Sequence, residues 1–70
     1  MAASYKKLWK LLIDRDMKKK DLRELTKLSS STIAKMTKNE PVSTDVLIKI
    51  CEVLNCDVGD IMEIVPDSKE

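Results

Sequence analysis

The stretch from Lys18 to Asn39 constrains the fold of this chain most, because it is typical of two short helices joined by a tight turn. Lysines stand near both of its ends. Its apolar residues recur at helical spacing on either side of four consecutive hydroxyl side chains: Leu22, Leu25 and Leu28 before them, Ile33 and Met36 after them. A hydroxyl-rich helix start between two basic ends suits a helix that enters a nucleic-acid groove.

A first helix is expected before this stretch. Ser4 is a plausible N-cap for it, and Leu8 and Leu12, four residues apart, form its inner face. Residues 14–16, with the sequence Asp-Arg-Asp, end it. The apolar surface of this helix is broader than one core stripe needs, so the excess packs either on the C-terminal segment or on a second copy of the chain.

The central stretch divides into a second and a third helix. We expect the second over residues 19–27, with Leu22 and Leu25 facing inward. Ser29 is the expected N-cap of the third helix, which runs to about residue 38 with its two large apolar residues inward.

A fourth helix is expected after Pro41, which favours an extended or turn geometry before it. Ser43 or Thr44 caps this helix, and Asn55 is a reasonable end for it. Its wide apolar face makes it the central element of the core and consists of Val46, Leu47, Ile50, Cys51, Val53 and Leu54.

The spacing of apolar residues predicts the secondary structure less clearly at the end of the chain. Asp57 is expected to cap a short fifth helix to about Glu63, with Val58 and Ile61 inward. Residues 64–66 could extend that helix, form a short strand or pack on a neighbour. The whole indicates an all-α domain over residues 1–66, followed by a flexible polar tail over residues 67–70.

Charge is divided unevenly along the chain, although the formal net charge is only +1. Residues 6–38 carry 11 basic and 4 acidic side chains, whereas residues 39–70 carry 2 basic and 8 acidic ones. One half can therefore face phosphates while the other faces away, unless these are ordinary solvated charges. Lys18, Lys19 and Lys20 oppose the macrodipole at a helix start, which indicates phosphate contacts or a solvated lysine run.

Residue types that enzymes and metal sites need are scarce. The chain has no histidine, and its single glycine, Gly59, excludes a Gly-rich phosphate loop. Cys51 and Cys56 alone do not make a zinc site, and we expect them to be reduced core residues. We therefore expect no catalytic residue, no metal and no cofactor. No stretch approaches the ~20 apolar residues that cross a bilayer, and no leader is evident, so a cytoplasmic protein is expected.

Taken in order, these features resemble the Cro/repressor-type (XRE-like) helix-turn-helix family of small bacterial and phage regulators, over residues 5–64. The resemblance is carried by Leu8, Leu12, Leu22, Leu28, Ser29, Ile33, Met36, Pro41, Leu47, Ile50, Leu54 and the closing Val58-Gly59-Asp60-Ile61. It implies a compact five-helix domain of the lambda-repressor-like type with a central helix-turn-helix. It also implies a bacterial or phage-encoded protein that is nucleoid-associated when bound.

The resemblance further implies that the third helix enters the major groove and reads base edges near its start. By position, the base-reading residues would be Ser30, Ser31, Ala34 and Lys35. Lysine can donate to guanine, and an alanine methyl can meet the thymine methyl. The phosphate contacts would be Lys18, Lys19, Thr32, Lys38 and Asn39, with Ser43 and Thr44 at the next helix start.

Two positions depart from the family pattern. Arg23 stands where the family often has a small residue, so its side chain must extend outward or the interhelical angle must differ. Lys27 stands where the family often has glycine, and the turn would require a left-handed backbone there, at roughly 1 kcal/mol for a non-glycine residue.

Family members commonly bind DNA as symmetric dimers. The candidates for such an interface, which otherwise belong to the monomer core, are Trp9, Ile13, Val46, Val53, Met62, Ile64 and Val65. We therefore expect a sequence-specific, double-stranded DNA-binding regulator that represses transcription as a homodimer. The alternative from another class is a protein-binding module on the same scaffold, for example an antitoxin-like protein. An enzyme is the third and weakest class.

Overall fold

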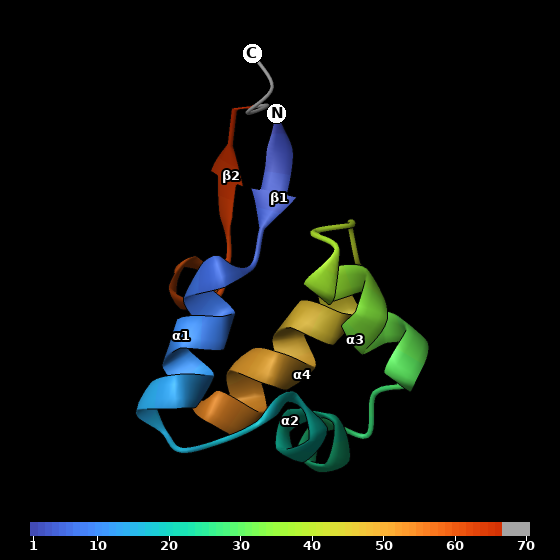
Figure 1. Ribbon diagram of the computed structural model, residues 1–70, viewed down its shortest axis with the longest axis vertical. Helices are drawn as coiled ribbons and strands as arrows, with labels where there is room; N and C mark the ends of the chain where they lie inside the picture. Colours follow the sequence, from blue (N-terminus) through green and yellow to red (C-terminus); the bar gives the residue numbers. More distant parts are fainter. Residues whose placement is uncertain (67–70) are drawn as a thin grey trace.

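The computed structural model describes residues 1–66, so the expected tail at residues 67–70 lies outside the described residues. A small helical body carries a projecting two-stranded ribbon that holds the N-terminus (Figure 1). The elements in chain order are β1 (Ala2–Ser4), α1 (Lys6–Asp14), α2 (Lys19–Thr26), α3 (Ser30–Thr37), α4 (Thr44–Leu54), the 3₁₀ helix η1 (Val58–Asp60) and β2 (Glu63–Val65).

The fold is mostly helical, but the expected all-α, five-helix architecture is wrong in two details. The fifth helix shrinks to the single 3₁₀ turn of η1, because Gly59 is a poor helix former and the chain becomes extended from Glu63 onward. β2 then pairs antiparallel with β1, with Ala3 opposite Ile64. Of the three alternatives expected for residues 64–66, the short strand is the one observed, because Ile64 and Val65 lie in β2.

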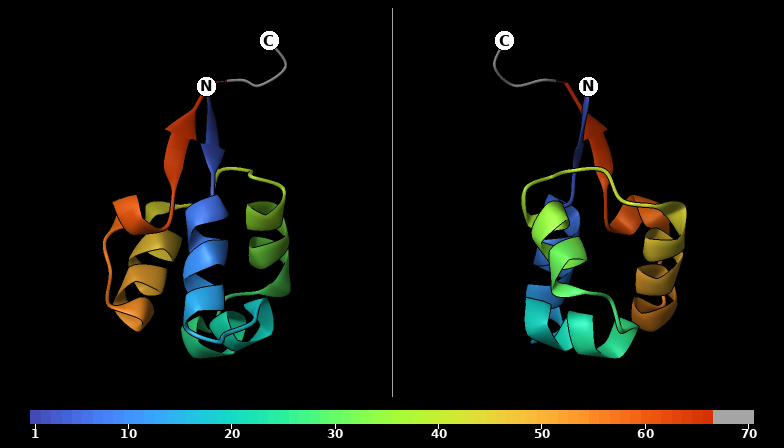
Figure 2. Two further views of the ribbon diagram at one scale, coloured as in Figure 1. Left: turned by 60° about the vertical axis from the view of Figure 1, so that its left-hand side comes forward. Right: turned by 90° about the vertical axis from the view of Figure 1, so that its right-hand side faces the viewer.

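The ribbon rises from the helical body at the start of α1 (Figure 2). Ser4, the expected cap of α1, belongs to β1, and Tyr5 occupies the capping position without a side-chain bond. Tyr5 is instead a buried core residue, so it anchors the base of β1. A two-stranded sheet is marginal by itself, and this anchorage ties it to the body.

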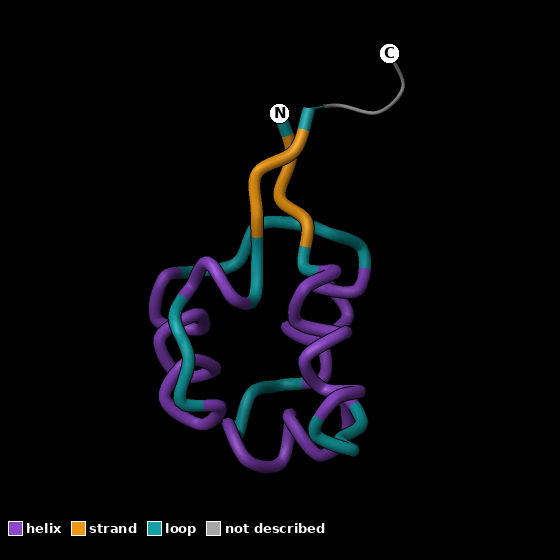
Figure 3. The backbone as a smooth tube through the Cα atoms, turned by 90° about the vertical axis from the view of Figure 1, so that its left-hand side faces the viewer, coloured by secondary structure: helices purple, strands orange, loops and turns teal. Residues whose placement is uncertain are grey.

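The helices surround a common interior (Figure 3). The residues that fill it are Tyr5, Leu8, Leu12, Leu22, Ile33, Met36, Ile50, Leu54 and Ile61. Most of the expected inward positions are thus confirmed, including Leu8 with Leu12 on α1. The half-buried Cys51 and Cys56 are free and pack against this core, as expected of small apolar residues.

Three expected inward residues are exposed instead: Leu25, Val58 and, at the edge of the apolar face of α4, Val53. Leu25 is 58% exposed, because Leu22 and Thr26, one turn apart, occupy the buried face of α2. The Thr26 hydroxyl donates to the Leu22 carbonyl at 2.7 Å, which satisfies a polar group inside the core. Val58 is 43% exposed, because η1 is too short to turn both Val58 and Ile61 toward the interior.

The fourth helix has the start and end that the sequence predicted. Ser43 caps it by accepting a hydrogen bond from the Val46 amide at 3.4 Å. Asn55 ends it in the left-handed conformation, at φ 53°. Ile50 and Leu54 are buried, whereas Val53 is exposed at the edge of the face. No helix within residues 1–66 is long and apolar enough to span a bilayer.

Candidate nucleic-acid interface

A three-residue turn joins α2 to α3 and sets how the two helices meet. Lys27 is left-handed there, at φ 60° and ψ 27°, which confirms the expectation for this position. Leu28 is half-buried against the core and holds the turn to the body. Ser29 then caps α3. Arg23, the other departure from the family pattern, is half-buried on α2.

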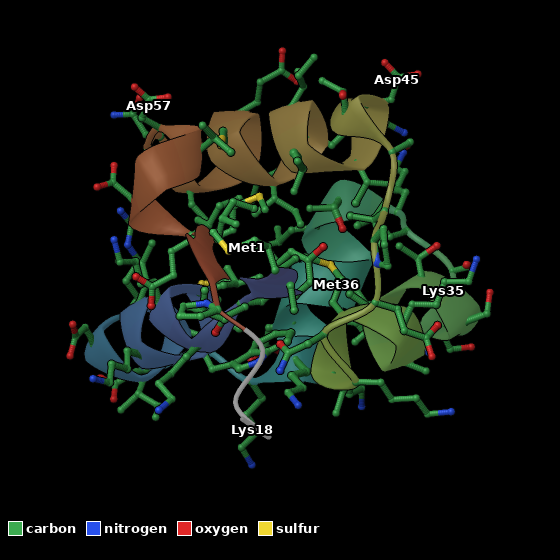
Figure 4. The ribbon with its side chains drawn as sticks, turned by 90° about the horizontal axis from the view of Figure 1, so that it is seen from above. Met1, Lys18, Lys35, Met36, Asp45 and Asp57 are labelled. Carbon is green, nitrogen blue, oxygen red and sulfur yellow. The ribbon has the colours of Figure 1, made fainter. Side chains whose placement is uncertain are left out.

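The two faces of α3 differ sharply in exposure. Ile33 and Met36 are buried. In Figure 4, Met36 lies within the molecule while Lys35 lies at its periphery. The four predicted base-reading residues are all exposed: Ser30, Ser31, Ala34 and Lys35. None of them is a large apolar residue, so α3 presents a small, polar and singly charged surface.

A hydroxyl cluster forms the start of this surface. Ser29 Oγ accepts a hydrogen bond from the Thr32 amide at 3.2 Å and lies 3.0 Å from each of Ser31 Oγ and Thr32 Oγ1. A hydroxyl donates once and accepts twice, so one of these neighbours donates to Ser29 and the other accepts from it. One of Ser31 and Thr32 therefore keeps its own O–H for an external acceptor.

Lys18 and Lys19, both predicted to contact phosphate, differ in their contacts within the protein. The Lys18 amide donates to Asp21 Oδ2 at 2.9 Å, so Asp21 supplies the acid favoured in the first turn of α2. The Lys18 side chain is exposed and projects from the molecule (Figure 4). The Lys19 ammonium lies 4.3 Å from the centre of the Trp9 ring and donates to Thr37 Oγ1 at 3.0 Å.

The Lys19 contacts were missed by the sequence reasoning. They join three helices, because Trp9 lies on α1, Lys19 begins α2 and Thr37 ends α3. An ammonium over an aromatic face at an exposed site gains roughly 0.5–1 kcal/mol. That gain is of the size of the unfavourable macrodipole interaction of a cation at a helix start, about 0.3–1 kcal/mol. No spacing in the sequence signals this arrangement.

At the other end of α3, Lys38 and Asn39 lead into the next loop. Lys38 is exposed. Asn39 is left-handed at φ 59°, and its Oδ1 accepts a hydrogen bond from the Tyr5 amide at 3.2 Å. The Tyr5 hydroxyl also donates to the Glu40 carbonyl at 3.0 Å. Asn39 therefore has a structural role that the sequence did not predict. Its side-chain nitrogen, Nδ2, is a donor that could serve a phosphate.

A hollow of about 300 Å³ separates the start of α3 from the start of α4. It brings together Thr32, Lys35 and Ser43, three of the predicted site residues. Ser43 Oγ is occupied as an acceptor by the cap of α4, and Asp45 follows in the first turn. A carboxylate there weakens the attraction of this helix start for a phosphate. Asp21 has the same effect in the first turn of α2, but that helix start also carries lysines at positions 18–20, whereas the start of α4 carries none.

The apolar residues predicted for a dimer interface come from several elements and differ in exposure. Ile13, Val53 and Ile64 are exposed and come from α1, α4 and β2. The remaining four are half-buried, and all of them except Val65 pack against the core: Trp9, Val46, Met62 and Val65.

Two observations concern possible metal ligands and the cysteine thiols in the part of the chain that the structure describes. Residues 1–66 contain no group of three or more His, Cys, Asp or Glu side chains that could hold a metal ion. Burial raises the pKa of the Cys51 thiol, and the neighbouring thiol of Cys56 raises it further. A thiol that is kept protonated is a poor nucleophile.

Comparison with known proteins identifies the fold and its family. A model of the Cro/C1-type HTH DNA-binding domain matches residues 7–67. A crystal structure of the transcriptional regulator VanUg, form II, is similar to this chain with a TM-score of 0.92 and 64% sequence identity. The similarity covers 94% of this chain and 88% of that one. No curated protein matches the chain significantly.

The family model spans most of the chain, so this protein belongs to the Cro/C1-type helix-turn-helix DNA-binding family. The resemblance that the sequence suggested is thereby confirmed, and α2 and α3 lie within the matched residues.

Proposed function

We propose that this protein is a transcriptional repressor that binds a two-half-site DNA operator as a homodimer, with α3 in the major groove. The observation that carries the proposal is the contrast between the two faces of α3. Ile33 and Met36 fix one face to the core, while the opposite face exposes only small, polar or basic side chains. A face of this kind fits against base edges, which present hydrogen-bonding groups and thymine methyls.

We assign recognition of the DNA bases to four residues of α3. Lys35 donates to guanine O6 or N7, and the Ala34 methyl meets a thymine methyl. The hydroxyls of Ser30 and Ser31 can each donate to or accept from a base. The Ser31 hydroxyl also either donates to Ser29 Oγ or accepts from it, over 3.0 Å. With a single long donor per monomer, readout by one half-site is modest, and a second half-site about 34 Å away would multiply it.

Phosphate contacts hold α3 in register. The proposed set is Lys18, Lys19, Thr32, Lys38 and Asn39, with weaker contributions from Ser43 and Thr44. It flanks α3 at both ends, so the helix would be clamped to the backbone on each side of the bases it reads. All of these side chains except that of Thr32 are exposed in the free protein, so they need no rearrangement of the core.

The dimer contact is proposed to use the exposed apolar residues. Ile64 on the ribbon is the strongest candidate, because it is 59% exposed and lines a hollow of about 330 Å³ with Pro41 and Met62. Ile13 and Val53 offer a second possible surface on the helical body. Sedimentation of wild type and Ile64→Glu distinguishes the two, because only a ribbon-based dimer dissociates in that variant.

Binding to the DNA upstream of the protein's own coding region tests the proposed function. We expect specific binding whose log K falls linearly with log salt, because each phosphate contact releases counterions. A random duplex of the same length is the control and should bind more weakly. A flat salt dependence, or equal affinity for both duplexes, would contradict the proposal.

A second candidate function is a protein-binding module. It is favoured by a hollow of about 390 Å³ between α4 and η1, lined by Ile48, Val58 and the acidic residues Glu52 and Asp57. Ile48 and Val58 are both exposed, and an apolar floor with an acidic rim suits a basic, amphipathic partner segment. A stoichiometric protein partner lost in Ile48→Asp, with no DNA binding at low salt, would favour this alternative.

A further inference from the structure

The Lys19 side chain is held where three helices meet. Its ammonium lies over the Trp9 ring, 4.3 Å from the ring centre, and donates to Thr37 Oγ1 at 3.0 Å. The Thr37 hydroxyl is already committed as a donor, because it bonds to the Ile33 carbonyl at 3.0 Å. Thr37 therefore acts only as an acceptor toward Lys19, and the ammonium is oriented from two sides.

The contacts of Lys19 leave part of its ammonium unused. An ammonium has three N–H donors, and one of them is directed to Thr37. Trp9 is half-buried and packs against the core, so its ring is a firm support, while Lys19 itself is exposed. The charge is thus placed beside Thr37, the last residue of α3, and donors remain for an anion.

We propose that Trp9 is a positioning residue for DNA binding, which holds the Lys19 ammonium beside the end of α3 so that it meets a backbone phosphate there. This inference rests on the proposed function. It also assigns Trp9 a role other than the dimer contact considered from the sequence.

The benefit of such positioning is entropic. A lysine free in solution loses rotamer freedom when it contacts a phosphate, whereas one already held by a ring and a hydroxyl loses less. Removing the ring should therefore weaken DNA binding by about three- to tenfold, the factor associated with immobilising one long side chain. A variant without the Trp9 ring keeps the charge of Lys19, so its weaker DNA binding would not result from a lost charge.

A double-mutant cycle on Trp9→Leu and Lys19→Met isolates this coupling. Affinity for a duplex selected from a random pool would be measured by fluorescence anisotropy over a range of salt. We expect Lys19→Met to lower the slope of log K against log salt by about 0.9, the value for one phosphate contact. Trp9→Leu should weaken binding in the wild type but not in the Lys19→Met background.

Two further variants separate positioning from general stability. Thr37→Val removes the acceptor for Lys19 from α3 without touching Trp9, and should also weaken binding. It serves as the deciding variant if thermal melting shows that Trp9→Leu does not fold. Lys49→Met removes an exposed lysine of α4 and is the matched charge control, with unchanged affinity expected.

Trp9 also reports on its own contact, because it is the only tryptophan in the chain. Its emission should change when wild type binds the duplex, and this change should be lost in Lys19→Met. Strictly additive effects of Trp9→Leu and Lys19→Met, or unchanged affinity in Thr37→Val, would overturn the inference. If wild type binds no duplex in a salt-dependent way, the proposed function itself fails, and that result is distinct from the others.

Discussion

The backbone amide of Tyr5 donates a hydrogen bond to Asn39 Oδ1 at 3.2 Å, and this bond joins the start of α1 to the end of α3. The Tyr5 hydroxyl reinforces it by donating to the Glu40 carbonyl at 3.0 Å. Because Tyr5 is buried, the loop after α3 is attached to the core and not only to its own helix. The loop indeed crosses the base of the ribbon in Figure 2. The surface of α3 is thereby held in place from its C-terminal end.

Replacing Asn39 should destabilise the protein in two separable ways. Asn39→Ala loses the acceptor for the Tyr5 amide and replaces asparagine at φ 59° by a residue that tolerates the left-handed region less well, which together should lower the free energy of unfolding by about 2–3 kcal/mol. Asn39→Gly loses the hydrogen bond but tolerates the left-handed backbone, so its loss should be smaller. Urea unfolding followed by circular dichroism measures both. Equal stability of the two variants would show that the backbone at Asn39 is not strained.

Tyr5 should make stability depend on pH in the alkaline range. Burial raises the pKa of its hydroxyl above the ordinary value of 10.0, while a contact with the Val42 backbone acts in the opposite direction. The unfolded state then loses the proton at a lower pH than the folded state. The associated stability is fully present below about pH 10 and is lost as pH rises toward the folded pKa.

The comparison with Tyr5→Phe isolates this effect from the titration of lysines. Wild type should be more stable than the variant by about 1 kcal/mol near neutral pH, owing to the bond to the Glu40 carbonyl. That advantage should shrink above about pH 10. Urea midpoints of both proteins over the alkaline range provide the measurement, and a constant difference would contradict the prediction. Tyr5 is the only tyrosine, so its ionisation can also be followed directly by ultraviolet absorbance.

Lys27→Gly should stabilise the protein. Lys27 is left-handed at φ 60°, which costs a residue with a Cβ roughly 1–2 kcal/mol, and glycine removes that strain. The greater freedom of glycine in the unfolded chain offsets part of the gain, so a net increase of about 0.5–1 kcal/mol is expected. Lys27→Ala is the control, since it removes the charge but keeps the Cβ, and it should not be stabilised. A Lys27→Gly protein no more stable than Lys27→Ala would exclude backbone strain as the cause.

Lys35 and Lys38 should differ in how they affect DNA binding. Lys35→Ala should relax sequence preference at one base pair, with a loss of about 1–3 kcal/mol for the preferred sequence and little for others. Lys38→Ala should weaken binding to all duplexes alike and lower the salt slope by about one contact. Selection from a random pool with each variant shows both effects. If Lys38→Ala altered the selected sequence and Lys35→Ala did not, the proposed roles would have to be exchanged.

Much of the helical body follows from local signals that the sequence displays directly. The caps at Ser29 and Ser43 and the left-handed end at Asn55 depend on a few neighbouring atoms, so they were predictable. Helical periodicity also predicted the exposed face of α3, because the positions of Ile33 and Met36 leave the others outside. Leu25 was misplaced because an apolar residue at the right spacing was preferred over the polar Thr26, whose hydroxyl is satisfied within the helix.

What the sequence determined by itself is therefore the helix-turn-helix, its basic character and its exposed face, since periodicity, capping and charge are properties of neighbouring residues. The tertiary structure alone decided the pairing of β1 with β2, the bond from Tyr5 to Asn39 and the seat of Lys19 between Trp9 and Thr37. These contacts join residues that are distant along the chain. They form only after the helices pack and bring their backbones and side chains within hydrogen-bonding distance, and no local pattern specifies them.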